Sequence, residues 1–214
     1  MKQNGIYIDN NATTPLDERV LQAMLPYFTH EFGNPSSSTH RYGWVAKDAL
    51  ETARKQVAET VGAEEGEITF TSGATDAINQ AIVVVYQLFK GHKNHFITAV
   101  TEHKAVLDAH RFIEKEGAQL TYLSVDNNGL IDLKQLENSI TENTAMVSVM
   151  LANNETGVLQ DVKSIAQIVH QKNHFNRGPH SINISIEEYD TLPACWRMKD
   201  EQERSYVLTS EYFV

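Results

Sequence analysis

The chain has 214 residues, of which 41% are hydrophobic, and its formal net charge is -10 at pH 7. This length is sufficient for one sizeable hydrophobic core. The acidic charge disfavours non-specific binding to nucleic acid and to anionic membrane surfaces.

Targeting signals and metal sites are not indicated either. No apolar run is long enough to span a bilayer, and the first residues lack the apolar core of a secretion signal. The single cysteine, Cys195, excludes an internal disulfide and fits a reducing compartment. The nine histidines show no close pairing typical of metal ligands. We therefore predict a cytoplasmic protein without a structural metal, a membrane contact or a nucleic-acid partner.

Strand-like runs and helix-period segments alternate along most of the chain. In order, the pattern predicts a strand at 6–9, helices at 17–28 and 42–61, a strand at 68–70, a helix ending at 89, a strand at 95–100, a helix closed by Gly117, a strand at 120–125, a helix at 133–140, a strand at 144–151 and a helix at 162–171. This alternation predicts an α/β fold, with a mostly parallel sheet covered by helices.

The stretch from Gly66 to Ile82 combines a short strand, a turn of small residues and the start of a helix. The first turn of a helix offers unpaired N–H donors and the positive end of the peptide dipole. Ser72 and Thr75 add hydroxyl donors, and Gly73 permits close approach of a ligand. The stretch indicates either a phosphate site or an ordinary turn capped by Ser or Thr.

Three polar clusters follow predicted strands, at Thr71–Thr75, Thr101–Lys104 and Asn153–Glu155. Ligands of parallel α/β folds bind beyond the carboxyl ends of the strands, so all three clusters are expected to face one crevice. His103 is an acid, a base or a ring that stacks on a planar ligand, or else an exposed strand-end residue. Asn154 binds a ligand hydroxyl, or else forms a local turn. Together the clusters predict a site for a flat phosphorylated cofactor.

These same residues lie in motifs that resemble the cysteine desulfurases of the NifS/IscS type, in the class V aminotransferase group of pyridoxal-phosphate enzymes. The resemblance runs from about Ile6 to about Lys172. Its motifs are Tyr7–Pro15, Phe32–Ser37, His40–Gly43, Phe70–Thr75, Thr101–Val106 and Asn153–Gly157. Several ordered motifs over most of a chain are far more specific than a single glycine pattern.

The resemblance implies a three-layer sheet domain of the pyridoxal-phosphate-dependent transferase fold type I, incomplete here, with helices on both faces. It implies that Ala74 and Thr75 hold the phosphate of pyridoxal 5'-phosphate. His103 would stack on the ring and take part in proton transfer, as the catalytic residue, and Asn154 would contact the ring's hydroxyl side. Asn11, Ala12 and Thr13 would lie near the substrate.

The activity implied is the conversion of L-cysteine to L-alanine, with the sulfur left as an enzyme persulfide. That sulfur would pass to an acceptor protein or scaffold for iron–sulfur cluster or thiocofactor assembly, and the enzyme would be a homodimer. We assign residues 1–172 to a partial cofactor-binding large domain and residues 173–214 to a divergent tail.

The tail departs from the family pattern. It contains neither the Asp-Ala-x-Gln segment, whose aspartate pairs with the pyridine nitrogen, nor the Ser-x-His-Lys segment, whose lysine forms the Schiff base. Lys199 lies in a run of charged residues and is expected to be a surface residue. The sequence therefore predicts a truncated desulfurase that is inactive alone and has weakened or lost cofactor binding. The alternatives are another class V enzyme, such as a selenocysteine lyase, or a non-catalytic desulfurase-like interaction protein.

Overall fold

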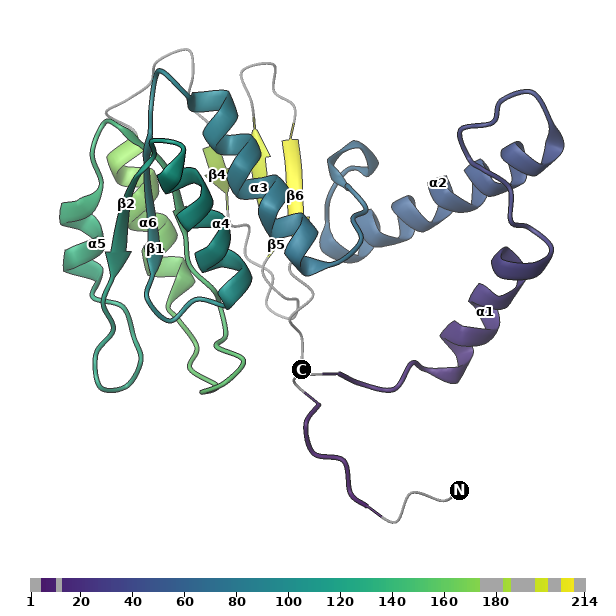
Figure 1. Cartoon of the computed structure of the whole chain (residues 1–214), viewed down its shortest axis with the longest axis horizontal. Coiled ribbons are helices and arrows are strands. Elements are labelled where there is room, and N and C mark those ends of the chain that lie inside the picture. Colours follow the sequence, from purple (N-terminus) through teal and green to yellow (C-terminus); the bar gives the residue numbers. More distant parts are fainter. Residues whose placement is uncertain (1–4, 11–12, 174–182, 186–194, 200–204, 210–214) are drawn as a thin grey trace. The chain divides into compact units, whose positions relative to one another are not determined.

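The structure, a computed structural model, describes residues 5–10, 13–173, 183–185, 195–199 and 205–209 (Figure 1). The chain divides after Ile68 into two compact units, an amino-terminal unit and a larger unit that begins at Thr69. Each unit is described by itself.

The amino-terminal unit contains the two predicted helices, α1 (Glu18–Thr29) and α2 (Arg41–Val61), and a short 3-10 turn, η1 (Glu65–Glu67). Asp17 caps α1, because its carboxylate accepts a hydrogen bond of 2.8 Å from the Arg19 amide. Gly62 ends α2 in the left-handed conformation, with φ of 64°, as a glycine just past a helix commonly does. Both helices predicted in this region are confirmed.

The loop before α2 is held by specific contacts. Its turn is closed by a bond from the Ser37 amide to the Asn34 carbonyl. The indole Nε1 of Trp44 donates to the Ser38 carbonyl over 2.7 Å. Gly43 lies so close to this loop that a Cβ atom built on it would stand 1.8 Å from the Ser37 carbonyl oxygen. The first turn of α2 and the loop therefore pack backbone against backbone.

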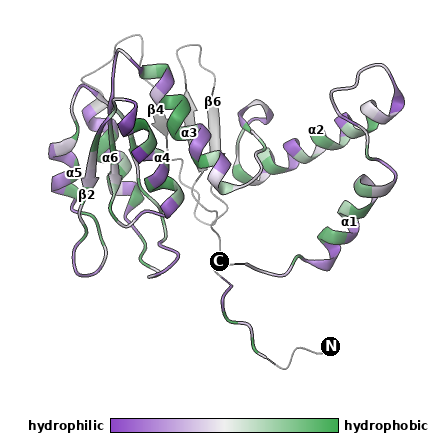
Figure 2. Cartoon of the chain, in the orientation of Figure 1, coloured by the Kyte–Doolittle hydropathy of each residue, from purple (hydrophilic) through white to green (hydrophobic). Residues whose placement is uncertain are grey.

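None of the residues of α1 is buried. Its apolar side chains recur at helical spacing and include Val20, Leu21, Met24 and Leu25, all of them exposed. Figure 2 shows the mixture of hydrophobic and hydrophilic residues along α1 and α2. Such an uncovered apolar face is typical of a surface that another element or chain covers.

The larger unit is built on a sheet of three parallel strands in the order β2-β1-β3. The strands are β1 (His95–Ala99), β2 (Gln119–Leu123) and β3 (Thr144–Ser148). Its helices are α3 (Ala74–Phe89), α4 (Lys104–Lys115), α5 (Leu133–Ser139) and α6 (Val162–Asn173). The predicted parallel α/β fold, with its strands alternating with helices, is confirmed.

Side chains of β1 alternate between two hydrophobic cores, one on each face of the sheet. Phe96 packs with residues of α3 and α4, such as Ile82 and Ile113. Ile97 packs on the other face with Leu136 and Ile165, which belong to α5 and α6. Alternation of this kind follows from the two-residue period of a strand. The unit therefore has three layers, with α3 and α4 on one face and α5 and α6 on the other.

Helices α3 and α4 run in the same direction. Near their carboxyl ends, the Tyr86 hydroxyl donates to the Glu116 carbonyl oxygen over 2.5 Å. Helix α3 ends just before β1 begins, and α4 begins just after β1 ends. The amino ends of both helices therefore lie at the edge where β1 ends. Figure 1 shows both helices beginning at the lower side of this unit.

Two predicted strands do not form. Residues 6–9 have no regular secondary structure and pair with no strand of the described chain, and Ile6 and Ile8 are 92% and 85% exposed. Residues 68–70 form no strand either, although Ile68 makes an isolated bridge and is buried. A β-branched run gives a strand only where a partner strand is present to bond with it.

The described segments of the tail form a separate antiparallel sheet in the order β4-β5-β6. These strands are β4 (Asn183–Ser185), β5 (Cys195–Lys199) and β6 (Ser205–Thr209). Cys195 is thus the first residue of β5. Across the residues described, no helix is long and apolar enough to cross a membrane, and no group of three or more His, Cys, Asp or Glu residues is placed to hold a metal ion.

Candidate functional site at the carboxyl edge of the sheet

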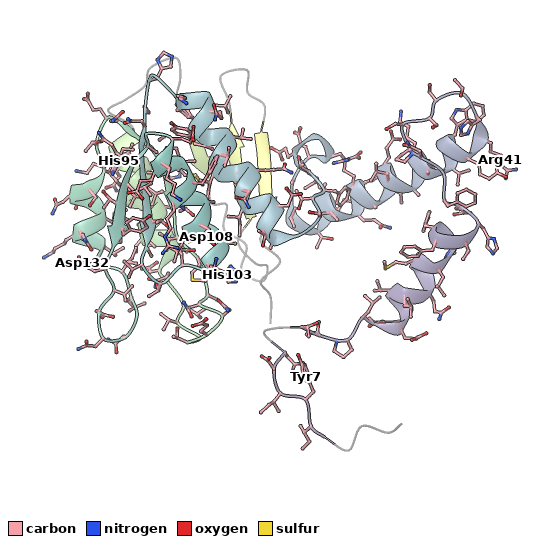
Figure 3. All side chains as sticks on the ribbon, in the orientation of Figure 1. Tyr7, Arg41, His95, His103, Asp108 and Asp132 are labelled. Atoms are coloured by element: carbon pink, nitrogen blue, oxygen red, sulfur yellow. The ribbon has the colours of Figure 1, made fainter. Side chains whose placement is uncertain are left out.

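The candidate site lies at the carboxyl edge of the parallel sheet, where β1 and β3 end and α3 and α4 begin. His95 starts β1 and His103 follows its end, so the two histidines mark opposite edges of the sheet (Figure 3). The amino edge is fully bonded at this point: the two ring nitrogens of His95 lie 2.8 Å from the hydroxyls of Thr144 and Thr121. The carboxyl edge carries the predicted site residues.

The amino end of α3 presents free backbone donors. Gly73 precedes the helix with φ of 153°, a conformation that favours glycine, and a Cβ there would meet no atom within 4 Å. In the described chain, no hydrogen-bond acceptor is recorded for the amides of Ala74 and Thr75. Thr75 is exposed and Ala74 half-buried. These two amides are the donors with which a helix amino end binds a phosphate.

Ser72 is differently placed from what the sequence suggested. Its amide and its hydroxyl both donate to Asp76 Oδ2, each over 3.1 Å. These bonds, the amide bond first, hold the pKa of the Asp76 carboxyl below its ordinary value. The Ser72 hydroxyl is therefore committed to Asp76 in the first turn of α3, and the hydroxyl available at this helix end is that of Thr75.

His103 caps α4. Its Nδ1 accepts a hydrogen bond of 3.1 Å from the Ala105 amide, so that nitrogen carries no proton in this arrangement and the ring is fixed at the helix start. The side chain is half-buried. The next residue, Lys104, forms an ion pair with Asp108 one turn further along α4 and is largely exposed. Of these two neighbours, the ring of His103 is the group held at the sheet edge.

Asn154 lies in the loop that follows β3, and the preceding residue shapes that loop. The Oδ1 atom of Asn153 accepts from the amides of Glu155 and Thr156, each over 2.9 Å. The loop is closed by a bond from the Asn153 amide to the Val158 carbonyl. Asn153 is thus the turn-forming residue, and Asn154 is half-buried at the tip that Asn153 organises.

Two side-chain bonds join the tip after β1 to the tip after β3. Asn153 Nδ2 donates to the Thr101 carbonyl over 2.9 Å. The Met150 amide donates to Glu102 Oε1 over 2.5 Å. His103 and Asn154 each directly follow a residue that makes one of these bonds. The structure therefore brings the second and third polar clusters together.

Glu102 is the least expected member of the edge. It is only 7% exposed, and this burial raises the pKa of its carboxyl to about 7, while the bond from the Met150 amide acts in the opposite direction. Sequence reasoning singled out its neighbours and gave it no role. The available signal was a charged residue between the end of a buried strand and the first turn of a helix, a place where only a bonded carboxyl is tolerated.

The structure places the predicted site residues in different parts of the chain. His103 and Asn154 follow tips that are bonded to each other, and Ala74 and Thr75 begin the helix that runs beside α4. Thr13 belongs to the amino-terminal unit, where it is exposed and its amide bonds to the Asp9 carbonyl. Asn11 and Ala12 lie outside the described residues.

The donor set fits a flat phosphorylated ligand. Free helix-end amides and a hydroxyl suit a phosphate, an imidazole suits an aromatic ring face or a proton, and an amide side chain suits a ring hydroxyl. The described strands of the tail supply none of the residues in this donor set.

Known proteins share this chain's sequence and fold. The model of the aminotransferase class-V family matches residues 6–176. The cysteine desulfurase IscS of Rickettsia massiliae (strain Mtu5) is 50% identical over 190 residues, which are 86% of this chain and 46% of the relative. The chain therefore spans about half the length of the curated relatives it matches.

Solved structures give the same result. A NifS-like protein superposes with a TM-score of 0.77 at 41% identity, over 79% of this chain and 46% of its own. The protein SspA in complex with cysteine has a TM-score of 0.72 at 36% identity, over 78% of this chain and 48% of its own. On the evidence of its sequence and of its three-layer parallel fold, the chain belongs to the aminotransferase class-V family of pyridoxal-phosphate-dependent enzymes, among relatives that are cysteine desulfurases.

Proposed function

We propose that this chain carries the cofactor-binding edge of a pyridoxal-phosphate-dependent cysteine desulfurase. One observation supports this most strongly: the tips bearing His103 and Asn154 are bonded to each other at the edge where α3 begins. The residue types gathered there suit the phosphate, the ring and the ring hydroxyl of one small molecule. Relatives named as cysteine desulfurases, and one named as a complex with cysteine, support L-cysteine as the substrate.

In this proposal each residue has one task. The amides of Ala74 and Thr75, with the Thr75 hydroxyl, bind the phosphate. His103 lies against the ring and moves a proton at its imidazole, and Asn154 donates to the ring hydroxyl. Pyridoxal phosphate, when bound, supplies the electron sink for breaking bonds at the substrate's α-carbon, while the protein supplies placement and electrostatics. Asn11, Ala12 and Thr13 are proposed to lie near the substrate.

Complete turnover needs groups that this sequence does not offer in the expected motifs. The printed residues after 173 hold no Asp-Ala-x-Gln and no Ser-x-His-Lys segment. We therefore propose that the 214-residue chain is inactive on its own and binds the cofactor more weakly than a full desulfurase. We also propose a cytoplasmic homodimer that passes sulfur to an acceptor protein or an iron–sulfur scaffold. The exposed apolar residues of α1 are consistent with burial against another chain.

The absence of those two segments also favours a second candidate, a non-catalytic protein that keeps a desulfurase-like surface. A selenocysteine lyase is the remaining alternative within class V. Release of sulfide from cysteine, compared with selenide from selenocysteine, separates the two enzymes. Neither product is expected from the non-catalytic protein.

Binding of the cofactor tests the proposal directly. The full chain is titrated with pyridoxal 5'-phosphate and, separately, with pyridoxal, which lacks the phosphate, and bound ligand is measured by equilibrium dialysis. We expect saturable binding of the phosphate ester, and weaker binding by about tenfold or more when Thr75→Val or His103→Leu removes one contact.

The matched control is Thr60→Val, which removes a threonine hydroxyl that bonds to the Gln56 carbonyl on α2. It should leave affinity unchanged. Equal affinity for pyridoxal and its phosphate ester would refute the assignment of α3 as a phosphate site.

A further inference from the structure

The backbone ladder between β1 and β3 stops before it reaches the site. Its last pair is Thr98 with Ser148. Beyond this pair, the segments that follow β1 and β3 continue to His103 and Asn154, which lie five and six residues after Thr98 and Ser148. Something other than the ladder must fix the spacing of these tips.

Side chains take over where the ladder ends. Glu102 accepts the Met150 amide over 2.5 Å, and Asn153 donates to the Thr101 carbonyl over 2.9 Å. Each bond is donated from β3's tip to β1's tip. The side chain belongs to β1's tip in the first bond and to β3's tip in the second. Asn153 is further constrained because its Oδ1 accepts two amides of its own loop.

The use of a carboxyl for this bond is costly. Glu102 is 7% exposed. Burial disfavours the charged form of a carboxyl, so burying this side chain lowers the stability of the fold at a pH where the carboxyl would otherwise be charged. A glutamine, which has the same length and shape, would accept the same amide without that cost. Residues that sacrifice stability in this way gather at functional sites. The burial of Glu102 beside His103 places a side-chain acceptor between the two tips at a cost in stability.

We propose that Glu102 is a positioning residue: by accepting the Met150 amide, it holds the tip that carries His103 against the tip that carries Asn154. Glu102 touches neither substrate nor cofactor in this role and acts through the two residues it aligns. The part of the proposal that concerns cofactor affinity rests on the proposed function, whereas the alignment of the tips does not.

The amino edge of the same two strands offers a matched control. There the Asn94 amide donates to Asn143 Oδ1 over 3.1 Å, and Asn143 Nδ2 donates to Asn94 Oδ1 over 2.6 Å. Asn143→Leu therefore removes a side-chain bridge between the same pair of strands at the opposite edge. A general loosening of the strand pair would follow from either substitution, whereas misalignment of the site would follow only from the substitution of Glu102.

The test compares Glu102→Leu, Glu102→Gln and Asn143→Leu in the full chain. Leucine removes the acceptor, while glutamine keeps it. Amide exchange at Met150 and the ring signals of His103 are followed by nuclear magnetic resonance without any ligand, and the affinity for pyridoxal 5'-phosphate is measured afterwards.

We expect Glu102→Leu to speed exchange of the Met150 amide about tenfold and to shift the His103 ring signals. The same substitution should lower the affinity for pyridoxal 5'-phosphate about tenfold. Glu102→Gln should restore all three values, and Asn143→Leu should leave the His103 signals and the affinity as in the parent chain. If Glu102→Leu fails to fold, Glu102→Met replaces it, because methionine is unbranched and of similar length but offers no oxygen acceptor to the Met150 amide.

Two results would overturn the proposal. The first is unchanged ring signals of His103 after loss of the Glu102–Met150 bond. The second is an equal change of those signals in Asn143→Leu. A parent chain that binds no pyridoxal 5'-phosphate would count against the proposed function alone, because the exchange rate and the ring signals still decide the role of Glu102.

Discussion

The buried carboxyl of Glu102 makes a definite prediction for the pH dependence of stability. Burial raises its pKa from 4.5 to about 7 in the folded protein. Between pH 4.5 and about pH 7, the folded state therefore keeps the Glu102 proton while the unfolded state releases it. The stabilisation is fully present below pH 4.5 and is lost as the pH rises to about 7.

The size of the effect follows from the same two values. Each pH unit of difference corresponds to roughly 1.4 kcal/mol, so the span from 4.5 to about 7 amounts to about 3 kcal/mol. Glu102→Gln keeps the acceptor for the Met150 amide and cannot ionise. We therefore expect the variant to be about 3 kcal/mol more stable than the parent above about pH 8 and to approach the parent near about pH 5.

The assay is urea denaturation followed by far-ultraviolet circular dichroism at several pH values. The difference between the parent and the variant isolates Glu102, since both share every other titrating group. Glu155→Gln, which neutralises an exposed carboxylate on the neighbouring tip, is the control for the charge change. A difference that stays constant between about pH 5 and about pH 8 would show that the burial argument is wrong.

Three further predictions concern the two units. Thr98→Val should stabilise the chain by about 1 kcal/mol in urea denaturation, because the buried Thr98 hydroxyl has no hydrogen-bond partner in the described chain; destabilisation would indicate a partner. Phe96→Ala should cost about 3 to 5 kcal/mol by the same measurement, because the ring is fully buried between the sheet and α4, and a loss below about 1 kcal/mol would contradict that packing. Gly43→Ala should lower the melting temperature and speed proteolysis in the loop at 33–38, because its Cβ would clash with the Ser37 carbonyl; an unchanged digestion pattern would contradict the close approach.

Much of the fold was predictable because its signals are local. The apolar spacing of α1 and α2, and Gly62 as a helix end, depend on residues a few positions apart. The strand after Asn94 and the helix after His103 were likewise found within a residue or two of their ends. The expected segments at 6–9 and 68–70 were wrong because a strand depends on a partner, which local sequence does not specify.

The site was only partly predictable for the same reason. A turn of polar residues after each strand is visible in the sequence, and the parallel topology places these turns at one edge. The reach of Asp76 back to Ser72 is also local, four residues apart, and was available as a capping signal. The bonds of Glu102 and Asn153 span 48 and 52 residues, and no local pattern distinguishes the asparagine that forms the turn from the one that follows it.

The two edges of the β1–β3 pair are built differently, and the difference has a functional meaning. At the amino edge the bridge consists of amide side chains that do not titrate, and His95 is bonded to hydroxyls on both sides, while burial lowers its pKa and favours the neutral ring. Because the neutral ring is the form favoured at neutral pH, that edge carries no ionisation cost there, and stability is lost only as the pH falls. At the carboxyl edge the equivalent bridge uses Glu102, whose burial costs stability at the same pH. At neutral pH, the bonds that join β1 to β3 without an ionisation cost therefore lie at the edge away from the site. The loss of stability from burying a carboxyl falls at the edge that carries His103 and Asn154.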